Sequence, residues 1–163
     1  MTDDIFLRSV ERNDIPALAA LEAACFSDPW NEAGLDLLLN PPYGGLCAMY
    51  GGRIDGYIGW IYFPAANGAD AEAEITRIAV APAARRRGLG RALLGGMLDR
   101  LAPAGESFTV FLDVRESNRA AQALYESFGF VQNGHRPRFY GGEDAREYIL
   151  TIPKGHHHVY SCF

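Results

Sequence analysis

The sequence predicts an α/β (α+β) fold, a mixed and strongly twisted sheet of about seven strands with four helices. Short runs of apolar and β-branched residues alternate with stretches in which apolar residues recur at helical spacing. The segment 74–94 also passes from a strand through a loop of arginines and glycines into a helix. At 163 residues and 48% hydrophobic composition, the chain is long enough for one compact domain and too short for two ordinary ones. We expect that domain to span 1–153.

The first part of the chain is predicted to form a strand, two helices and a hairpin. Asp14 is a candidate N-cap, and Pro16 is tolerated in the first turn that follows it. The Ser27–Trp30 segment breaks this helix, and Asn31 or its neighbour caps a second one. The Gly51-Gly52 pair is typical of a hairpin turn. The predicted elements are strand 5–10, helix 14–26, a short helix from 31 to about 40, and strands 46–50 and 54–63.

The remaining elements follow from the same patterns. The strand that starts near Glu74 ends where Pro82 interrupts the ladder, and Leu89, Leu93 and Met97 then recur at helical spacing. The predicted elements are strand 74–80, helix 89–101, strand 107–114, helix 118–128, and strands 130–133 and 147–152.

The loop before the helix at 89–101 has the properties of an anion-binding site. Arg85, Arg86 and Arg87 precede Gly88-Leu89-Gly90, and Arg91 follows. The first N–H groups of a helix have no internal acceptor, the helix dipole adds positive potential, and glycines let a phosphate approach the main chain. The loop therefore predicts a phosphate-containing ligand.

Two common phosphate loops fit the segment poorly. A P-loop requires Gly-Lys-Ser/Thr, whereas Gly90 is followed by Arg91-Ala92. A dinucleotide loop requires G-x-G-x-x-G/A, but Leu93 stands at the third small position. Asp113 does lie at about the distance expected for a ribose-binding acid, so the dinucleotide reading stays as a weaker alternative.

A third pattern fits. Arg85-Arg86-Arg87-Gly88-Leu89-Gly90, after a strand that ends in Ala-Val, resembles the acetyl-CoA loop R/Q-x-x-G-x-G/A of the GNAT superfamily of N-acetyltransferases. Val114-Arg115-Glu116-Ser117-Asn118 and the segment 120–130 resemble the V-R-x-S-N and A-x-x-L-Y-x-x-x-G-F motifs of its RimI-like branch, whose members acetylate the N-terminal alanine of a ribosomal protein. Pro29-Trp30 and Arg138-Phe139-Tyr140 agree with that branch. The resemblance covers about residues 5–153.

The resemblance implies a coenzyme site and a general acid. Two central strands would splay near Val80, admit the pantetheine arm of acetyl-CoA, and leave the Val80 N–H to stabilise the oxyanion. Tyr125 matches the general acid that protonates the coenzyme thiolate; from its residues alone, a tyrosine on an apolar helical face is normally a core residue. The implied coenzyme-binding residues are Ile78, Ala79, Val80, Arg85, Arg86, Arg87, Gly88, Leu89, Gly90, Arg91 and Asn118.

The general base has two candidates. An ammonium has no lone pair, so a carboxylate or a water chain must take its proton before attack. The RimI-like pattern has Glu before Val-Arg, whereas this chain has the shorter Asp113; Glu74 matches the base of other GNAT branches. The resemblance also makes Trp30, Phe139 and Tyr140 candidates for acceptor binding. Glu22 and Asp28 could bind an ammonium too, but nothing in the sequence separates them from surface acids.

Composition limits the partners. A formal net charge of −5 disfavours nonspecific nucleic-acid binding and favours a basic or amine substrate. No leader or membrane-spanning run is visible, and the three cysteines lack metal or disulfide spacing, which predicts a cytoplasmic protein. We expect a monomer or homodimer. Residues 154–163 form a tail whose His156–His158 run could bind metal, but the tail is assigned no function, and the chemistry requires no metal.

These observations predict an acetyl-CoA-dependent N-acetyltransferase, with a protein N-terminus, such as that of a ribosomal protein, as its acceptor. Acetylation of a small amine or an aminoglycoside-like amine is a second interpretation, because fold and coenzyme loop are shared and only the acceptor groove differs. A non-catalytic acyl-CoA-binding regulatory module is a third, against which Glu74, Asp113 and Tyr125 argue together.

Overall fold

The computed structural model describes residues 4–156 and 160. Its contacts divide it into two compact units. The first unit contains residues 4–62, 76–101 and 160, and the second contains 63–75 and 102–156. Strand β4 (Ala71–Val80) contributes its first half to the second unit and its second half to the first. The expectation of a single domain over 1–153 stays a prediction.

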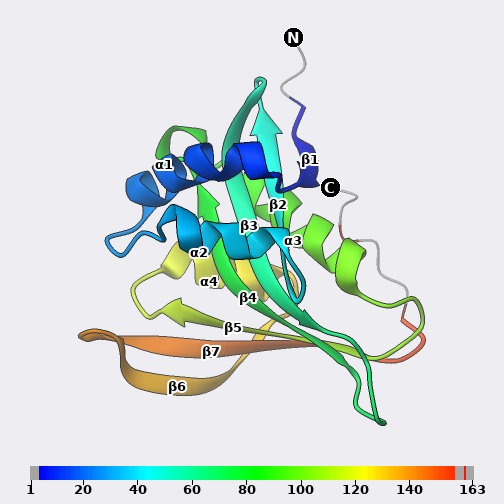
Figure 1. The fold of residues 1–163 in the computed structure, drawn as a ribbon. Helices are drawn as coiled ribbons and strands as arrows, with labels where there is room; N and C mark the ends of the chain where they lie inside the picture. Colours follow the sequence, from blue (N-terminus) through cyan, green and yellow to red (C-terminus); the bar gives the residue numbers. More distant parts are fainter. Residues whose placement is uncertain (1–3, 157–159, 161–163) are drawn as a thin grey trace. The chain divides into compact units, whose positions relative to one another are not determined.

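The strands form a mixed sheet in the order β1-β2-β3-β4-β5-β7-β6 (Figure 1). Strands β4 and β5 are parallel, whereas the pairs β1–β2, β2–β3, β5–β7 and β6–β7 are antiparallel. The described residues contain seven strands and four α-helices, which confirms the predicted α/β fold with its mixed seven-stranded sheet.

The first unit combines the N-terminal strands with three helices. Its buried cluster joins Leu18 of α1, Leu35 of α2 and Tyr57 of β3, each with no exposed surface. Asn31 caps α2 as expected, since its side chain accepts a hydrogen bond from the Gly34 N–H. The elements are β1 (Phe6–Ser9), α1 (Ile15–Cys25), α2 (Glu32–Asp36), β2 (Tyr43–Tyr50), β3 (Arg53–Phe63, whose last residue belongs to the second unit) and α3 (Leu89–Leu101), with short 3-10 helices at Arg12–Asp14, Leu37–Leu39 and Pro82–Ala84.

Asp14 stands at the N-cap position of α1 as predicted, but its side chain makes no capping hydrogen bond to that helix. Its carboxylate instead accepts hydrogen bonds from the Glu11 N–H at 2.8 Å and from both terminal nitrogens of Arg8. Residues Arg12–Asp14 form a 3-10 turn, so the carboxylate closes the turn before the helix. The Asp14 carboxylate therefore accepts from Arg8 and Glu11 and does not cap the helix.

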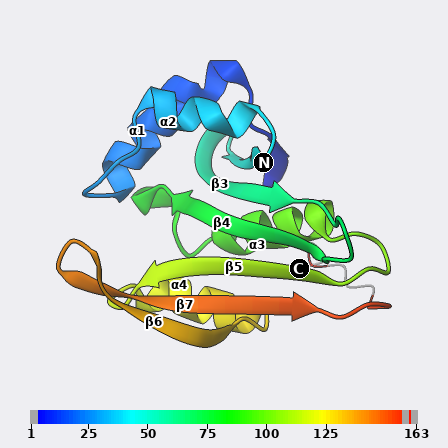
Figure 2. The ribbon, with the colours of Figure 1, turned by 60° about the horizontal axis from the view of Figure 1, so that its bottom comes forward.

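The second unit is built on β5 (Phe108–Arg115), α4 (Arg119–Ser127), β6 (Val131–Tyr140) and β7 (Glu143–Ile152). Figure 2 shows β5, β7 and β6 as neighbouring strands with α4 beside them. Tyr125 of α4 packs against Phe130 and Tyr148, with ring centroids 5.6 Å and 6.4 Å away. This contact fixes α4 against β7.

The predicted boundaries of the last two strands were too short. Each has ten residues, and together they make one long hairpin around Gly141. Most of β6 is exposed and its pairing shifts register between Gln132 and Gly134, so it lacks the apolar alternation by which strands are predicted. Within the described residues, no helix is long and apolar enough to cross a membrane. Of the His156–His158 run, His157 and His158 lie outside the described residues.

Candidate active site

The predicted phosphate loop lies in the first unit, at the start of α3. Arg86 and Gly88 have positive φ angles of 64° and 86°, which turn the chain sharply before Leu89 begins the helix. Arg85, Arg86, Arg87 and Gly88 are exposed, whereas Leu89 is buried and anchors the first helical turn. The loop therefore presents cationic side chains and the orphan N–H groups of a 13-residue helix. This arrangement suits a phosphate.

Two of the loop arginines are held by neighbours in the first unit. The Arg85 Nε donates to the Val80 carbonyl at 3.1 Å, and Arg87 donates to the Tyr50 hydroxyl at 2.7 Å. Val80 also accepts a hydrogen bond from Cys25 Sγ. Of the three strand residues predicted to contact the coenzyme, Ile78 and Val80 are half-buried and Ala79 is buried. Their roles stay predictions.

A pocket of about 390 Å³ lies in the second unit. Residues of β4, β5, β6 and β7 line it, including the predicted site residues Glu74, Asp113 and Phe139. Four of the lining side chains are carboxylates, and Arg136 is the single lining arginine. An acidic pocket of this kind attracts a cationic amine. The carboxylate residues are Glu72, Glu74, Asp113 and Glu147.

Strand geometry brings the two candidate bases to this pocket. Glu74 of β4 pairs with Phe111 of β5, and Asp113 lies two residues beyond Phe111, on the same face. Glu74 is exposed, while the Asp113 side chain keeps only 18% of its exposure. Burial raises the pKa of Asp113, against a smaller opposing effect of Arg136, and Glu147 raises that pKa further. A carboxylate with a raised pKa has a stronger affinity for the proton of an amine.

Tyr125 is almost fully buried in α4, at 3% exposure. Burial raises the pKa of its phenol above the ordinary value of 10, with a smaller contribution from Tyr140. The phenol therefore stays protonated at neutral pH and can donate a proton. Neither Tyr125 nor Tyr140 nor Asn118 lines the acidic pocket.

Asn118 is the N-cap residue of α4. Its side-chain oxygen accepts a hydrogen bond from the Ala121 N–H, which caps the helix. The side-chain NH2 group is then the part of Asn118 that can donate to a coenzyme. The aromatic pair Phe139 and Tyr140 is in edge-to-face contact at 5.0 Å, and Phe139 is 48% exposed.

Trp30 lies in the first unit, where it is tied to a buried carboxylate. Its backbone N–H donates to Glu22 at 2.8 Å, and its ring lies 5.2 Å from the guanidinium of Arg77. Glu22 has no exposed surface and also accepts hydrogen bonds from Tyr57 and Arg77. Glu22 is therefore a buried structural acid, and the sequence had not distinguished it from a surface carboxylate.

Glu147 and Arg136 are among the pocket residues that were missed from the sequence. Both belong to the long hairpin whose extent was underestimated. Glu147 stands directly opposite Asp113 in the β5–β7 register. Its position depends on that register, which sequence patterns alone do not specify.

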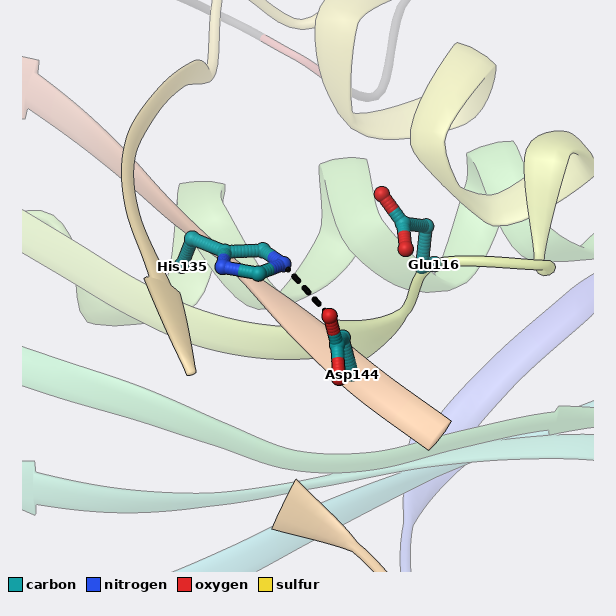
Figure 3. Close-up of side chains that lie close together, drawn as sticks. All are labelled: Glu116, His135 and Asp144. Carbon is teal, nitrogen blue, oxygen red and sulfur yellow. Dashed lines mark ion pairs between the residues drawn. The ribbon is translucent and has the colours of Figure 1, made fainter. Parts of the chain in front are cut away.

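A second polar cluster of this unit joins Glu116, His135 and Asp144 (Figure 3). The His135 Nε2 is 3.0 Å from an Asp144 oxygen, and ligand-type atoms of all three residues lie within 4.8 Å of one another. Arg146 donates to Glu116 at 3.2 Å, and the Arg138 N–H donates to Asp144 at 2.9 Å. Protein groups thus already supply hydrogen bonds to both carboxylates. The cluster connects the β6–β7 hairpin to the loop after β5.

The model of the acetyltransferase (GNAT) family matches residues 15–130. This chain belongs to that family. It is accordingly an acetyl-CoA-dependent N-acetyltransferase, and the resemblance seen in its motifs is confirmed.

This GNAT acetyltransferase is similar over most of its length to curated relatives. It is 34% identical over 149 residues to the [ribosomal protein bS18]-alanine N-acetyltransferase of Escherichia coli K12, covering 90% of this chain and 96% of the relative. It is 36% identical over 157 residues to the N-alpha-acetyltransferase RimI of Mycobacterium tuberculosis, covering 94% and 96%.

A solved structure gives the same result for the fold. The crystal structure of the ribosomal-protein-S18-alanine N-acetyltransferase from Escherichia coli matches with a TM-score of 0.80 and 33% identity, and covers 96% of this chain and 99% of that chain. The GNAT acetyltransferase therefore shares the fold of that enzyme over the matched length. The roles of individual site residues stay predictions.

Proposed function

We propose that this enzyme transfers the acetyl group of acetyl-CoA to the N-terminal α-amino group of a protein, with a ribosomal protein as the first candidate. The observation that carries the proposal is the pocket lined by Glu74, Asp113, Glu72 and Glu147, which suits a cationic amine and offers a base for its proton. The similarity to [ribosomal protein bS18]-alanine N-acetyltransferases over 90% of this chain favours a protein N-terminus among amines.

The chemistry follows from the residues of the second unit. The acceptor arrives as an ammonium, since the pKa of an α-amino group is about 7.7–8.0. Asp113, helped by Glu74 or a bridging water, removes one proton, and the free amine attacks the thioester carbonyl. The new C–N bond forms, the carbonyl oxygen becomes an oxyanion, and the C–S bond then breaks. Tyr125 gives its phenolic proton to the departing thiolate, which leaves as a thiol. The extra proton on the new amide nitrogen then passes through solvent to the phenolate, so that the products are the amide, the thiol and the proton held by Asp113.

The coenzyme is assigned to the loop of the first unit. The backbone amides of residues 86–91 would hold the pyrophosphate, while Arg85, Arg87 and Arg91 neutralise its charge. The Val80 N–H would donate to the oxyanion, and the Asn118 amide would contact the pantetheine arm. Trp30, Phe139 and Tyr140 are each assigned to binding of the acceptor peptide.

The location and assembly of the enzyme are also proposed. Acting on ribosomal proteins would place it in the cytoplasm, where its free Cys25 and Cys47 would stay reduced. One chain carries every residue assigned above, so a monomer would suffice for turnover, and a homodimer is compatible with the same assignment.

The test is thiol release from acetyl-CoA with three acceptors: an alanine-initiated peptide with a free N-terminus, the same peptide with a blocked N-terminus and an internal lysine, and a panel of polyamines and aminoglycosides. We expect turnover on the free N-terminus alone. Tyr125→Phe should lower kcat by about a hundredfold or more, the size of a lost general acid. Tyr43→Phe makes the same chemical change on β2 and serves as the control.

Other results would contradict the proposal in distinct ways. Turnover confined to small amines would assign a different acceptor to the same chemistry. Tight binding of acetyl-CoA without turnover on any amine would favour a regulatory module. Equal kcat values for Tyr125→Phe and Tyr43→Phe would remove Tyr125 from the reaction.

A further inference from the structure

Arg136 lies between two carboxylates of the acidic pocket. Its Nε and its Nη2 are each 2.8 Å from the same Glu147 oxygen. The Nε is also 3.6 Å from an Asp113 oxygen. The guanidinium is thus held by hydrogen bonds to Glu147 and faces Asp113 as an ion-pair partner. Charge-assisted hydrogen bonds of this length are the stronger ones in proteins.

The backbone is shaped to place this ion pair. Glu147 is directly opposite Asp113 in the β5–β7 register and opposite Gly134 in the β6–β7 register. The β6 strand changes register between Gln132 and Gly134. A Cβ on residue 134 would overlap the Glu147 carboxylate, so the glycine creates the room in which that carboxylate lies. Register, bulge and glycine together direct Glu147 toward Arg136.

We propose that Glu147 and Arg136 are positioning residues of acyl transfer: Glu147 fixes the Arg136 guanidinium beside Asp113, where it keeps the Asp113 carboxylate ionised and ready to accept the acceptor's proton. The inference rests on the proposed function, because it assigns that proton to Asp113. The proton passes from the ammonium nitrogen to an Asp113 oxygen, and the guanidinium exchanges no proton. Neither Glu147 nor Arg136 had a role in the sequence-based assignment.

The charges around Asp113 determine what each residue should do. The other ionised groups that line the pocket are Glu72 and Glu74 from β4, Glu147 from β7 and Arg136 from β6. Burial raises the pKa of Asp113, Arg136 lowers it and Glu147 raises it. Without Arg136, Asp113 would face only like charges and would be harder to ionise. Glu147→Gln would remove this negative charge but leave an amide oxygen to accept from Arg136, so Asp113 would keep the cation and be easier to ionise.

The experiment compares Arg136→Gln and Glu147→Gln, two changes that preserve size. Arg138→Gln is the matched control, because Arg138 is an exposed arginine on the same strand. The carboxyl carbon of Asp113 is titrated by NMR in the free enzyme, and the pH profile of kcat/KM is measured with the free-N-terminus peptide. A direct titration does not depend on turnover.

We expect opposite shifts in the two variants. Arg136→Gln should raise the pKa of Asp113 and lower kcat/KM by about threefold at the acidic end of the profile, the scale of a half-exposed ion pair, with little change at the alkaline end. Glu147→Gln should lower that pKa, and Arg138→Gln should leave it unchanged. Arg136→Lys, which retains the charge, should restore most of the wild-type profile. A purely structural role would move both variants in the same direction.

The outcomes separate this inference from the function on which it rests. Shifts of the Asp113 titration in the same direction in both variants, or shifts no larger than that of Arg138→Gln, would overturn the inference even if the peptide is acetylated. Opposite shifts in an enzyme that acetylates no free N-terminus would support the electrostatic coupling and remove the proposed acceptor. If Arg136→Gln does not fold, Glu147→Gln carries the test, because it should still lower the pKa of Asp113 relative to Arg138→Gln.

Discussion

At the scale of a residue, the partly buried position of Asp113 lowers the stability of the folded protein when its carboxylate is ionised. Burial raises its pKa in the folded state above the ordinary value of 3.8, so its contribution to stability is fully present below that ordinary value. The contribution is lost as the pH rises through the folded-state pKa. At neutral pH the ionised carboxylate therefore destabilises the fold slightly, as expected of a functional acid.

Asp113→Asn should consequently raise the melting temperature at neutral pH by about 2 °C. The gain should disappear below the ordinary pKa of an aspartate, because the wild-type side chain is then neutral as well. Thermal unfolding monitored by circular dichroism at several pH values measures this difference. The same variant should lose most of its acetyl transfer. A melting temperature that is lower at neutral pH would show that the ionised carboxylate contributes more to the fold than its desolvation costs.

Single residues were predicted unequally well. Glu74 and Asp113 were found because their motif positions mark them, and the structure brings both to one pocket. Their catalytic roles, and that of Tyr125, stay predictions. Arg136 and Glu147 carried no motif, and their proximity to Asp113 depends on a hairpin register and a bulge. These three side chains are brought together by the pairing register of their strands, and a local sequence pattern does not predict that register.

At the scale of elements, a buried carboxylate joins α1 to β4 within the first unit. Glu22 accepts hydrogen bonds from Tyr57 of β3 and from Arg77 of β4, and the Arg77 guanidinium stacks 3.9 Å from the Phe26 ring centroid. The Arg77 side chain is 12% exposed, and that of Glu22 is fully buried. Removing one member would leave a buried charge without its partner.

Glu22→Ala should therefore destabilise the protein by about 3 kcal/mol. The expected readout is a lower midpoint of urea unfolding. Tryptophan emission should also shift to the red, because the Trp30 backbone loses the hydrogen bond to Glu22 that holds this residue in place. Glu106→Ala, which removes an exposed ion pair with Lys154, is the control and should change stability by less than about 0.5 kcal/mol. Equal midpoints for the two variants would mean that water replaces the lost carboxylate.

Elements were easier to predict where periodicity is strong. The helix at 89–101 and the helix near 118–128 follow from their apolar spacing, and both lie where expected. The strands β6 and β7 extend beyond their predicted ranges because β6 is exposed along most of its length. Cross-strand partners, rather than a buried apolar face, define such a strand. Asp14 stands at the predicted N-cap position of α1 but makes no capping hydrogen bond for a similar reason, since its partner Arg8 lies on β1.

At the scale of the whole molecule, one loop carries a local charge opposite in sign to the net charge of the chain. The chain has a formal net charge of −5, yet residues 85–91 contain four arginines. The repulsion between an acidic protein and an anionic coenzyme is thus overcome locally. Interactions between exposed charges are screened by salt, with a Debye length of about 10 Å at 0.1 M. Binding of the coenzyme should depend on ionic strength accordingly.

The Kd for acetyl-CoA should rise about fivefold between roughly 0.05 M and 0.5 M sodium chloride, because the exposed arginines lose most of their attraction for the phosphates. Acetyl-pantetheine, which carries the same thioester without phosphates, is the control, and its weaker binding should change little over the same range. Isothermal titration calorimetry measures both. Equal salt dependence for the two compounds would show that the arginine–glycine loop does not bind the phosphates. The thioester arm would then carry the affinity, and the assignment of the loop would fail even though the chain remains an acetyltransferase.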